Sequence, residues 1–479
     1  MQDPSDTTDQ IAGHGVVVRA SNGDVIRYDP TGLVMRLSDR VIADIALRLG
    51  HGAGPQGGAR PEPPQPGPPP EPARDPEALL DGIDAWGVTQ LGDWLHFSAR
   101  MPGAQGVRGF RRHITGGAVL GDGPGAVLGI LGLGGPRAAL ANPGAPAFAH
   151  HIVSAADDIG AVGMAGIDIA PRTDRLEPLR ETTHEALVAE TILHWQIETF
   201  GPLPLIVTRA ETDPSASAAD LAQGRAVENL LIAAANQKAA AALMGKRAKL
   251  LAVCLDFACE HLGDDPIAYR DGMLAVMARV SDGLWSLGYD RPLFVARFET
   301  GLDPAQAAAV VQGQWELSWN HGDHRLIHSA PSASFACDSY DRPTEAGRRQ
   351  MAEMTAAAIA AGPDWRCPTL FLAEWEPGAS PVIRVTAQAE GPLTLEQGMA
   401  HGFALGGAGA PSIISVGIAP DDPQAILLQL SARAEGVQLT YGLGMQGALR
   451  DGWSMPSRTG ATLRRWALPA ILSVHGGRA

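Results

Sequence analysis

The sequence has few cysteines, few aromatic residues and no long hydrophobic run. Its four cysteines are too few and too scattered for a disulfide framework, and no C-x-x-C pair exists to form a zinc site of that type. We expect Cys254, Cys259, Cys337 and Cys367 to be buried, reduced thiols. Because no apolar run reaches the ~20 residues of a transmembrane helix, we also expect no membrane span.

Clustered basic residues are absent as well. The net charge is −15, and Lys and Arg form no patch of the kind that binds nucleic acid. Neither a P-loop nor a dinucleotide-binding glycine motif is present, so no cofactor is expected. The N-terminus lacks a basic segment followed by an apolar run, which predicts synthesis in the cytoplasm without a secretory signal. A protein of this kind would leave the cell by another route, such as lysis with a phage-like particle.

Proline and glycine are abundant, with 37 and 57 copies. Residues 51–75 form a linker in which the stretch Pro61–Pro72 holds eight prolines and no apolar side chain. Such a segment extends as a polyproline rod, here up to ~75 Å long at ~3 Å per residue. The rod suits either an anchoring arrangement, with a small module before a larger body, or a spacer of no special function.

Residues 1–50 are predicted to form that small module. The dipeptide Asn22–Gly23 lies between two β-branched runs and favours a tight hairpin turn. Residues 37–49 have helical apolar spacing, with Ser38 as the N-cap. We expect this module to bind a particle or a partner protein.

Residues 76–362 alternate strand-like and helix-like segments, and this pattern predicts an α/β domain with a parallel sheet between two helical layers. The expected strands cover residues 204–208, 249–256, 292–297 and 325–328, and the expected helices cover 218–244, 267–287, 303–315 and 344–361. Ligands of such sheets bind at the carboxyl ends of the strands. Residues 363–479 instead carry short, regularly spaced strand-like runs between turns, which predicts a C-terminal β-sandwich.

The segment Asp338–Gly347 (DSYDRPTEAG) carries a family resemblance. It is similar to the last sequence block of the SGNH (GDSL-like) hydrolases, which has an Asp, then His-Pro-Thr, then Gly and a helix. The order of blocks over residues 110–362 resembles the carbohydrate and sialate acetylesterase branch of this family. The resemblance implies a five-stranded parallel sheet and a serine nucleophile. It also implies an Asp–His pair that activates the serine and backbone or amide donors for the oxyanion.

The residues that carry hydrolysis in that family are replaced here. The best match to the first block, residues 115–121, places Ala118 at the nucleophile position. In the second block, Ser215 follows a proline near the expected glycines. In the third block, Glu260 and the later Tyr269 remain, but the Gln-Gly pair is lost. In the last block, Arg342 stands in place of the histidine, four residues after Asp338. Because arginine stays protonated, it cannot accept a proton from a nucleophile.

Several of these positions are candidates for binding a ligand instead. Trp319 and His321 lie in a stretch where aromatic rings neighbour amides and carboxylates, as in sugar-binding pockets. Glu260 and His261 follow a predicted strand, where ligands bind. For Asp338 and Arg342, the alternative is an ion pair that holds the loop. For Trp319 the alternative is a core position, on one helical face with Trp315.

Three hypotheses follow. The first is a catalytically degenerate SGNH-like protein that binds a cell-surface glycan, as an oligomeric spike, fibre or adhesion component of a phage-like particle. The second is an active carbohydrate O-acetylesterase with Thr115, Ser215 or Ser217 as nucleophile and His261 or His324 as base. The third is a structural assembly protein without a ligand. The histidines near residue 321 lack H-E-x-x-H spacing, so we expect no metal.

Overall fold

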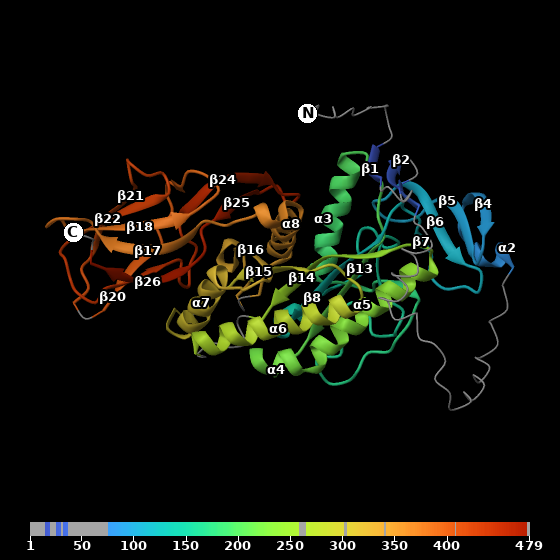
Figure 1. Ribbon diagram of the computed structural model, residues 1–479, viewed down its shortest axis with the longest axis horizontal. Helices are drawn as coiled ribbons and strands as arrows, with labels where there is room; N and C mark the ends of the chain where they lie inside the picture. Colours follow the sequence, from blue (N-terminus) through green and yellow to red (C-terminus); the bar gives the residue numbers. More distant parts are fainter. Residues whose placement is uncertain are drawn as a thin grey trace, which may run out of the picture. The chain divides into compact units, whose positions relative to one another are not determined.

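The computed structural model describes residues 75–257, 265–300, 304–339, 342–407 and 409–476, and the backbone alone of residues 15–19, 25–29 and 32–36 (Figure 1). The chain divides into two compact units, Met1–Pro70 and Glu71–Ala479, and each is described by itself.

The first unit contains one antiparallel sheet. Its strands are β1 (Gly15–Arg19), β2 (Val25–Asp29) and β3 (Gly32–Arg36), in that order. Gly15 pairs with Tyr28, so β1 and β2 form the hairpin that Asn22–Gly23 predicts. The helix expected over residues 37–49 and the proline-rich segment lie outside the described residues.

A seven-stranded sheet forms the centre of the second unit, in the order β11-β10-β13-β8-β14-β15-β16. The strands are β8 (Val127–Gly134), β10 (Ile152–Ala155), β11 (Leu176–Pro178), β13 (Ile206–Thr212), β14 (Ala248–Asp256), β15 (Leu293–Phe298) and β16 (Arg325–Pro331). Neighbouring strands run parallel except β10 and β11. Five of them, β13-β8-β14-β15-β16, follow the 2-1-3-4-5 order of a doubly wound sheet. The expected parallel sheet is confirmed, with two further strands at one edge.

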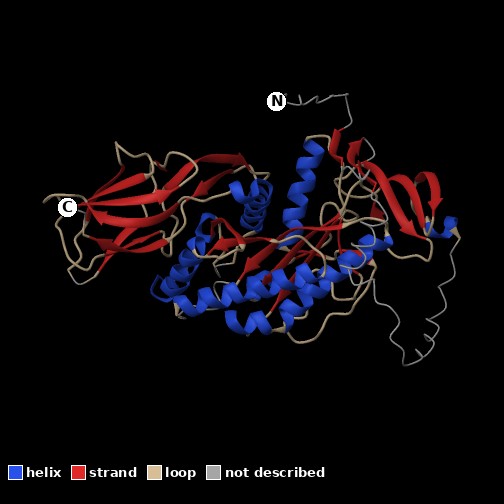
Figure 2. Ribbon diagram, viewed as in Figure 1, coloured by secondary structure: helices blue, strands red, loops and turns tan. Residues whose placement is uncertain are grey.

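Helices cover both faces of this sheet, which makes the mixed α/β architecture that the sequence predicts (Figures 1 and 2). The helices are α3 (His184–Glu198), α4 (Ala218–Gln223), α5 (Arg225–Leu243), α6 (Pro266–Ser286), α7 (Pro304–Trp319) and α8 (Glu345–Ala361). Side chains alternate across a strand, so Ile130 packs with α3 and α8 while the next residue, Leu131, packs with α4 to α7.

The single helix expected over residues 218–244 is two helices, because the chain breaks at Gly224. This glycine has extended backbone angles (φ −83°, ψ 172°) and is the N-cap of α5. Ser217 caps α4 through a capping box with Asp220. Ser217, a nucleophile candidate of the esterase hypothesis, therefore serves as a helix cap, and glycine's poor helix propensity explains the break.

The sequence did not predict the antiparallel sheet that precedes the parallel one. After the short α2 (Pro76–Leu79), this sheet consists of β4 (Ala85–Leu91), β5 (Trp94–Arg100), β6 (Val107–His113) and β7 (Leu120–Gly121). Phe97 and Phe110 form its own small core. Two short strands, β9 (Asn142–Pro143) and β12 (Glu181–Thr182), pair separately near the start of α3.

The C-terminal region is rich in strands, as expected. One sheet has the order β20-β23-β26-β17-β18-β22-β21 and a second has the order β19-β24-β25. The strands are β17 (Thr369–Trp375), β18 (Val382–Gln388), β19 (Thr394–Leu395), β20 (Phe403–Gly406), β21 (Ile413–Ile418), β22 (Ala425–Leu430), β23 (Gln438–Tyr441), β24 (Leu449–Pro456), β25 (Thr462–Trp466) and β26 (Ala470–His475). Leu449 of β24 packs in one core with Ile383 and Ile426 of the larger sheet.

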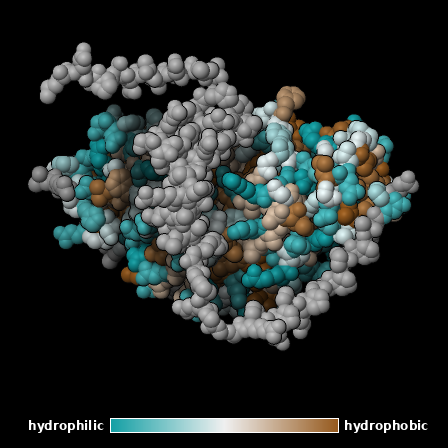
Figure 3. Space-filling model, turned by 45° about the vertical axis from the view of Figure 1, so that its right-hand side comes forward, coloured by the Kyte–Doolittle hydropathy of each residue, from teal (hydrophilic) through white to brown (hydrophobic). Residues whose placement is uncertain are grey.

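Arg465 joins this region to the α/β part. It is buried, its guanidinium lies 2.6 Å from Asp451, and it stacks over Trp365 at 5.2 Å. Trp365 in turn donates to the His328 carbonyl of β16, so this stack lies where the strand-rich region meets the α/β part. On the face shown in Figure 3, hydrophobic residues lie among hydrophilic ones. Within the described residues, no helix combines the length and the hydrophobicity that crossing a membrane requires.

Candidate functional site

The carboxyl ends of β8 and β14 are where a doubly wound sheet of this order binds its ligand. The chain leaves β8 as Gly134-Gly135-Pro136-Arg137. A Cβ on Gly134 would lie 2.1 Å from the carbonyl oxygen of Asp256, so glycine allows this close approach. Pro136 offers neither a nucleophile nor an amide hydrogen. This strand end therefore lacks the groups that would attack an ester.

The expectation that Ala118 marks the nucleophile position is wrong. Ala118 lies between β6 and β7 and packs with Val127, the first residue of β8, and with Met244. It is therefore near the amino end of that strand, away from the carboxyl edge. The glycines around Ala118 belong to the antiparallel sheet, whose existence the sequence pattern did not reveal.

Ion pairs occupy the carboxyl edge. Arg137 contacts Glu299 at 2.6 Å and Asp256 at 3.4 Å, and Arg297 also pairs with Asp256. The Glu299 carboxylate accepts hydrogen bonds from the Thr300 amide and the Ser332 hydroxyl. Burial raises the pKa of Asp256, but the nearby arginines outweigh burial, and the pKa is lowered. The charged groups at this edge therefore form ion pairs with one another.

Little space remains beside these ion pairs. The described residues at this edge enclose a cavity of about 30 Å³, lined in part by His184, Pro343 and Arg348. A cavity of this size holds about one water molecule. Arg348 donates to Asn142 at 2.6 Å and to the carbonyl of Leu140 at 2.8 Å. Glu260 and His261 lie outside the described residues.

Asp338 and Arg342 form the ion pair that was the alternative to ligand binding. The guanidinium nitrogens lie 2.9 and 3.1 Å from one carboxylate oxygen, and the Arg342 amide donates to the other. The Thr344 hydroxyl accepts from the Gly347 amide at 3.0 Å and caps α8, as the sequence predicts. A Cβ on Gly347 would lie 2.5 Å from the carbonyl oxygen of Ala336, so a larger residue would clash at this position.

In the described part of the chain, a side-chain hydroxyl lies within hydrogen-bonding distance of an imidazole at three places. Thr355 contacts His184 at 3.2 Å near the carboxyl edge, but the threonine is only 2 % exposed. Burial lowers the pKa of His184 to about 3. A substrate cannot reach this buried hydroxyl, so the contact is a packing interaction.

The second contact involves Thr115, a nucleophile candidate of the esterase hypothesis. Its hydroxyl lies 2.9 Å from Nδ1 of His113 and 3.2 Å from the Arg175 guanidinium. Its amide donates to the same Nδ1, which makes that nitrogen an acceptor. The threonine lines a cavity of about 430 Å³ beside Glu177. Ser215, in contrast, is exposed and bonds to Asp213.

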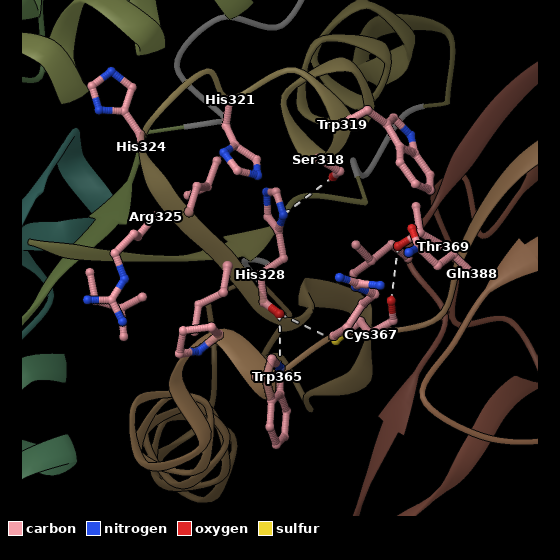
Figure 4. A pocket seen from close by; sticks show the side chains of 16 residues that line it. Ser318, Trp319, His321, His324, Arg325, His328, Trp365, Cys367, Thr369 and Gln388 are labelled. Carbon is pink, nitrogen blue, oxygen red and sulfur yellow. Dashed lines mark hydrogen bonds between the residues drawn. The ribbon is translucent and has the colours of Figure 1, made fainter. Parts of the chain in front are cut away.

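The third contact lies in a cavity of about 310 Å³, which we call the Trp319 cavity (Figure 4). It lies between the C-terminal end of α7, the start of β16 and the strands β17 and β18. Its polar and aromatic lining residues are Ser318, Trp319, His321, His324, Arg325, His328, Trp365, Arg366, Thr369 and Gln388. The structure therefore brings the candidates Trp319 and His321 into one cavity. It separates them from Asp338 and Arg342.

Two imidazoles of the Trp319 cavity, His324 and His328, favour the neutral form. Burial lowers the pKa of His328 to about 3 and also lowers the pKa of His324. The Ser318 hydroxyl lies 3.5 Å from Nδ1 of His328, but it donates to the carbonyl of Gln314. Because a histidine with so low a pKa is a weak base, this pair is poorly suited to activate a nucleophile. Neutral imidazoles can instead both donate and accept hydrogen bonds.

Two nitrogens at this cavity are buried and have no hydrogen-bond partner among the described residues. They are Nε1 of Trp319 and Nδ1 of His321. In Figure 4 the rings of His321 and His328 point toward each other, and Trp365 lies behind His328 with its Nε1 donating to the His328 carbonyl. A buried unpaired donor is unfavourable by about 1–3 kcal/mol. A polar molecule that reached these nitrogens through a side-chain rotation would relieve that strain.

No group of three or more His, Cys, Asp or Glu residues arranged to hold a metal is found among the described residues. Cys254 and Cys367 are buried free thiols and Cys337 is exposed. Burial raises the pKa of the Cys367 thiol to about 12, so this cysteine stays protonated beside the cavity.

No family model matches the chain, and no curated protein matches it in sequence. Solved structures that align with it include a carbohydrate acetylesterase from Xanthomonas citri, with 12% identity, a TM-score of 0.48 and coverage of 80% of this chain and 86% of that chain. A protein from Arabidopsis thaliana aligns with 11% identity and a TM-score of 0.31, over 50% of this chain and 99% of that chain. The N-terminal part of the bacterial S-layer protein SbsC aligns with 12% identity and a TM-score of 0.15, over 43% of this chain and 38% of that chain. At these values the alignments assign neither a family nor an activity.

Glu185 at the start of α3 generates a pH prediction. Burial raises its pKa to about 7 from an ordinary 4.5, so the folded protein keeps a proton that the unfolded chain releases. This contribution to stability is complete below pH 4.5 and is lost as the pH rises to about 7. We expect Glu185→Gln, which mimics the protonated carboxyl, to melt at a higher temperature than the parent at pH 8 and at a similar temperature at pH 5.

Thermal melts of both proteins from pH 5 to pH 8 measure this difference. Glu198→Gln at the exposed end of the same helix is the control and should show no such pH dependence. A melting difference for Glu185→Gln that stays constant over this range would contradict the assignment.

Proposed function

We propose that this protein has an SGNH-like scaffold and binds a surface glycan in the Trp319 cavity without hydrolysing it. The 2-1-3-4-5 strand order and the Asp338–Gly347 segment support the scaffold. In that scaffold the reaction would take place at the carboxyl edge, where this chain has Pro136 and the Arg137 ion pairs.

The chemistry of the Trp319 cavity supports a saccharide. Sugars present apolar faces, which pack on aromatic rings, and hydroxyls, which both donate and accept hydrogen bonds. Trp319 supplies an indole ring, and Thr369 and Gln388 supply a hydroxyl and an amide. The two arginines of the cavity, Arg325 and Arg366, are exposed, so the interior carries little charge.

The observation that carries the proposal is that Trp319 and three imidazoles line one ligand-sized cavity, while the cavity that the described residues form beside Arg137 has room for about one water. We expect the purified protein to bind one or more polysaccharides on an array of bacterial surface glycans. Trp319→Ala should weaken that binding about tenfold or more, because a buried tryptophan at a binding site contributes about 2 kcal/mol or more.

Trp285→Ala is the matched control for this substitution. Trp285 lies on α6, is 73 % exposed and does not line the Trp319 cavity. The control should bind as the parent does, and both variants should melt close to the parent. An absence of glycan binding by the folded parent, or unchanged binding by Trp319→Ala, would overturn the proposal.

A second candidate function rests on the contact between Thr115 and His113. Nδ1 of His113 is placed to accept the threonine proton, and Arg175 donates to the same oxygen. In this alternative, Thr115 would attack a carbohydrate ester with His113 as the base. If so, a fluorophosphonate probe would label the protein, and Thr115→Ala would abolish the label.

Under the binding proposal we expect no such label and no acetate release from O-acetylated sugars. Ser215→Ala serves as a control, because Ser215 is an exposed hydroxyl bonded to Asp213. Labelling that Thr115→Ala removes and Ser215→Ala retains would establish the esterase instead.

We further propose the setting that residues 51–75 suggest, with residues 1–50 anchoring the binding body to a released phage-like particle as an oligomer. The proline-rich composition of residues 61–72 supports a spacer between the two. Gradient fractionation of a culture supernatant with an antibody against the chain tests this setting. The chain should sediment with particles, and its recovery only in particle-free fractions or in the cytosol would contradict the setting.

A further inference from the structure

A second cavity lies along the same two elements as the Trp319 cavity. It has a volume of about 500 Å³ and lies between α7 and the strands β17, β23 and β26. Its lining includes Gln312 and Trp315 of α7, Phe371 of β17, Gln438 of β23, and Ser473 and His475 of β26. We call it the Phe371 cavity.

A row of three aromatic side chains lies between the two cavities. The ring centroids of Trp315 and Trp319 lie 6.1 Å apart, and those of Trp319 and Phe371 lie 5.7 Å apart, both in edge-to-face geometry. Trp319 lines the first cavity, whereas Trp315 and Phe371 line the second. The two cavities therefore share one aromatic wall.

The geometry of β17 and α7 gives the length of the combined surface. On β17, Thr369 lines the first cavity and Ala373 lines the second. A β-bulge lies between them, and they pair opposite Gln388 and Val385, which are three residues apart, or ~10 Å at ~3.3 Å each. On α7, Trp319 and Ala308 are eleven residues apart, or ~16 Å at 1.5 Å per residue. Both lengths exceed one pyranose ring, so one sugar unit cannot fill the surface.

The Phe371 cavity suits an uncharged, hydroxyl-rich ligand. No Asp, Glu, Lys or Arg occurs among the described residues that line it. Phe371 is 41 % exposed, a high value for so large an apolar side chain. Gln438, Ser473 and His475 are also exposed and provide amide, hydroxyl and imidazole groups beside this ring. An aromatic face surrounded by neutral polar groups is again what a sugar ring requires.

We infer that the two cavities are neighbouring subsites of one groove that binds a linear, uncharged stretch of polysaccharide along α7 and β17. This inference rests on the proposed function, because it takes the Trp319 cavity as a saccharide site. It adds the class of ligand, a chain of several units rather than a single sugar or a chain end. It also adds Phe371 as the residue at which the second subsite begins.

The test uses the full-length protein and fragments of one to six sugar units, prepared by partial acid hydrolysis of the polysaccharide with the strongest array signal. Titration calorimetry should show affinity rising about tenfold or more between the single unit and the longer fragments. Phe371→Ala should reduce this gain, measured as the ratio of the affinities for the longer fragments and the single unit, to about twofold. Phe200→Ala, which removes a 96 % exposed phenylalanine outside both cavities, is the matched control and should retain the full gain.

The outcomes separate the inference from the proposed function. If fragments of every length bind equally and Trp319→Ala abolishes their binding, the single-site proposal stands and the groove is refuted. If affinity does rise with fragment length but Phe371→Ala leaves that rise intact, the second subsite at Phe371 is refuted. If no polysaccharide on the array binds, both proposals fall together.

Discussion

The ion pairs at the carboxyl edge of the central sheet are the constraint on which the rest of the account depends. Arg137, after β8, is tied to Asp256 at the end of β14 and to Glu299 after β15. Of these side chains, Glu299 is buried, so removing Arg137 would leave a buried carboxylate without this partner. Among the described residues, these ion pairs occupy the usual ligand position of the fold, and a substrate there would disrupt them.

The described residues form ligand-sized cavities near the other ends of the strands. The Trp319 cavity includes Leu293 and Arg325, which are the first residues of β15 and β16. Thr369 and Gln388 of the C-terminal region complete it. The proposed binding surface therefore requires both the α/β part and the strand-rich part, and the buried Arg465 helps to join them.

The sequence predicted the features that depend on residues close together in the chain. Apolar runs and helical spacing gave the parallel strands and the helices, and the Asp338 ion pair and the Thr344 cap both follow from side chains a few residues apart. The Ala118 assignment failed because the hairpins before β8 resemble a glycine-rich motif. Trp319 and His321 were recognisable as neighbours in sequence. Gln388, which lines the same cavity, could not be recognised from the sequence. It reaches the cavity only because β18 pairs with β17, which places Gln388 opposite Thr369.

A crystal structure of the protein soaked with fragments of a bound polysaccharide tests the central claim most directly. The account predicts electron density for a sugar ring against Trp319, with the contacts of Arg137 to Glu299 and Asp256 unchanged. Density for a sugar or an acyl group beside Arg137 and Pro136, with those ion pairs opened, would contradict it.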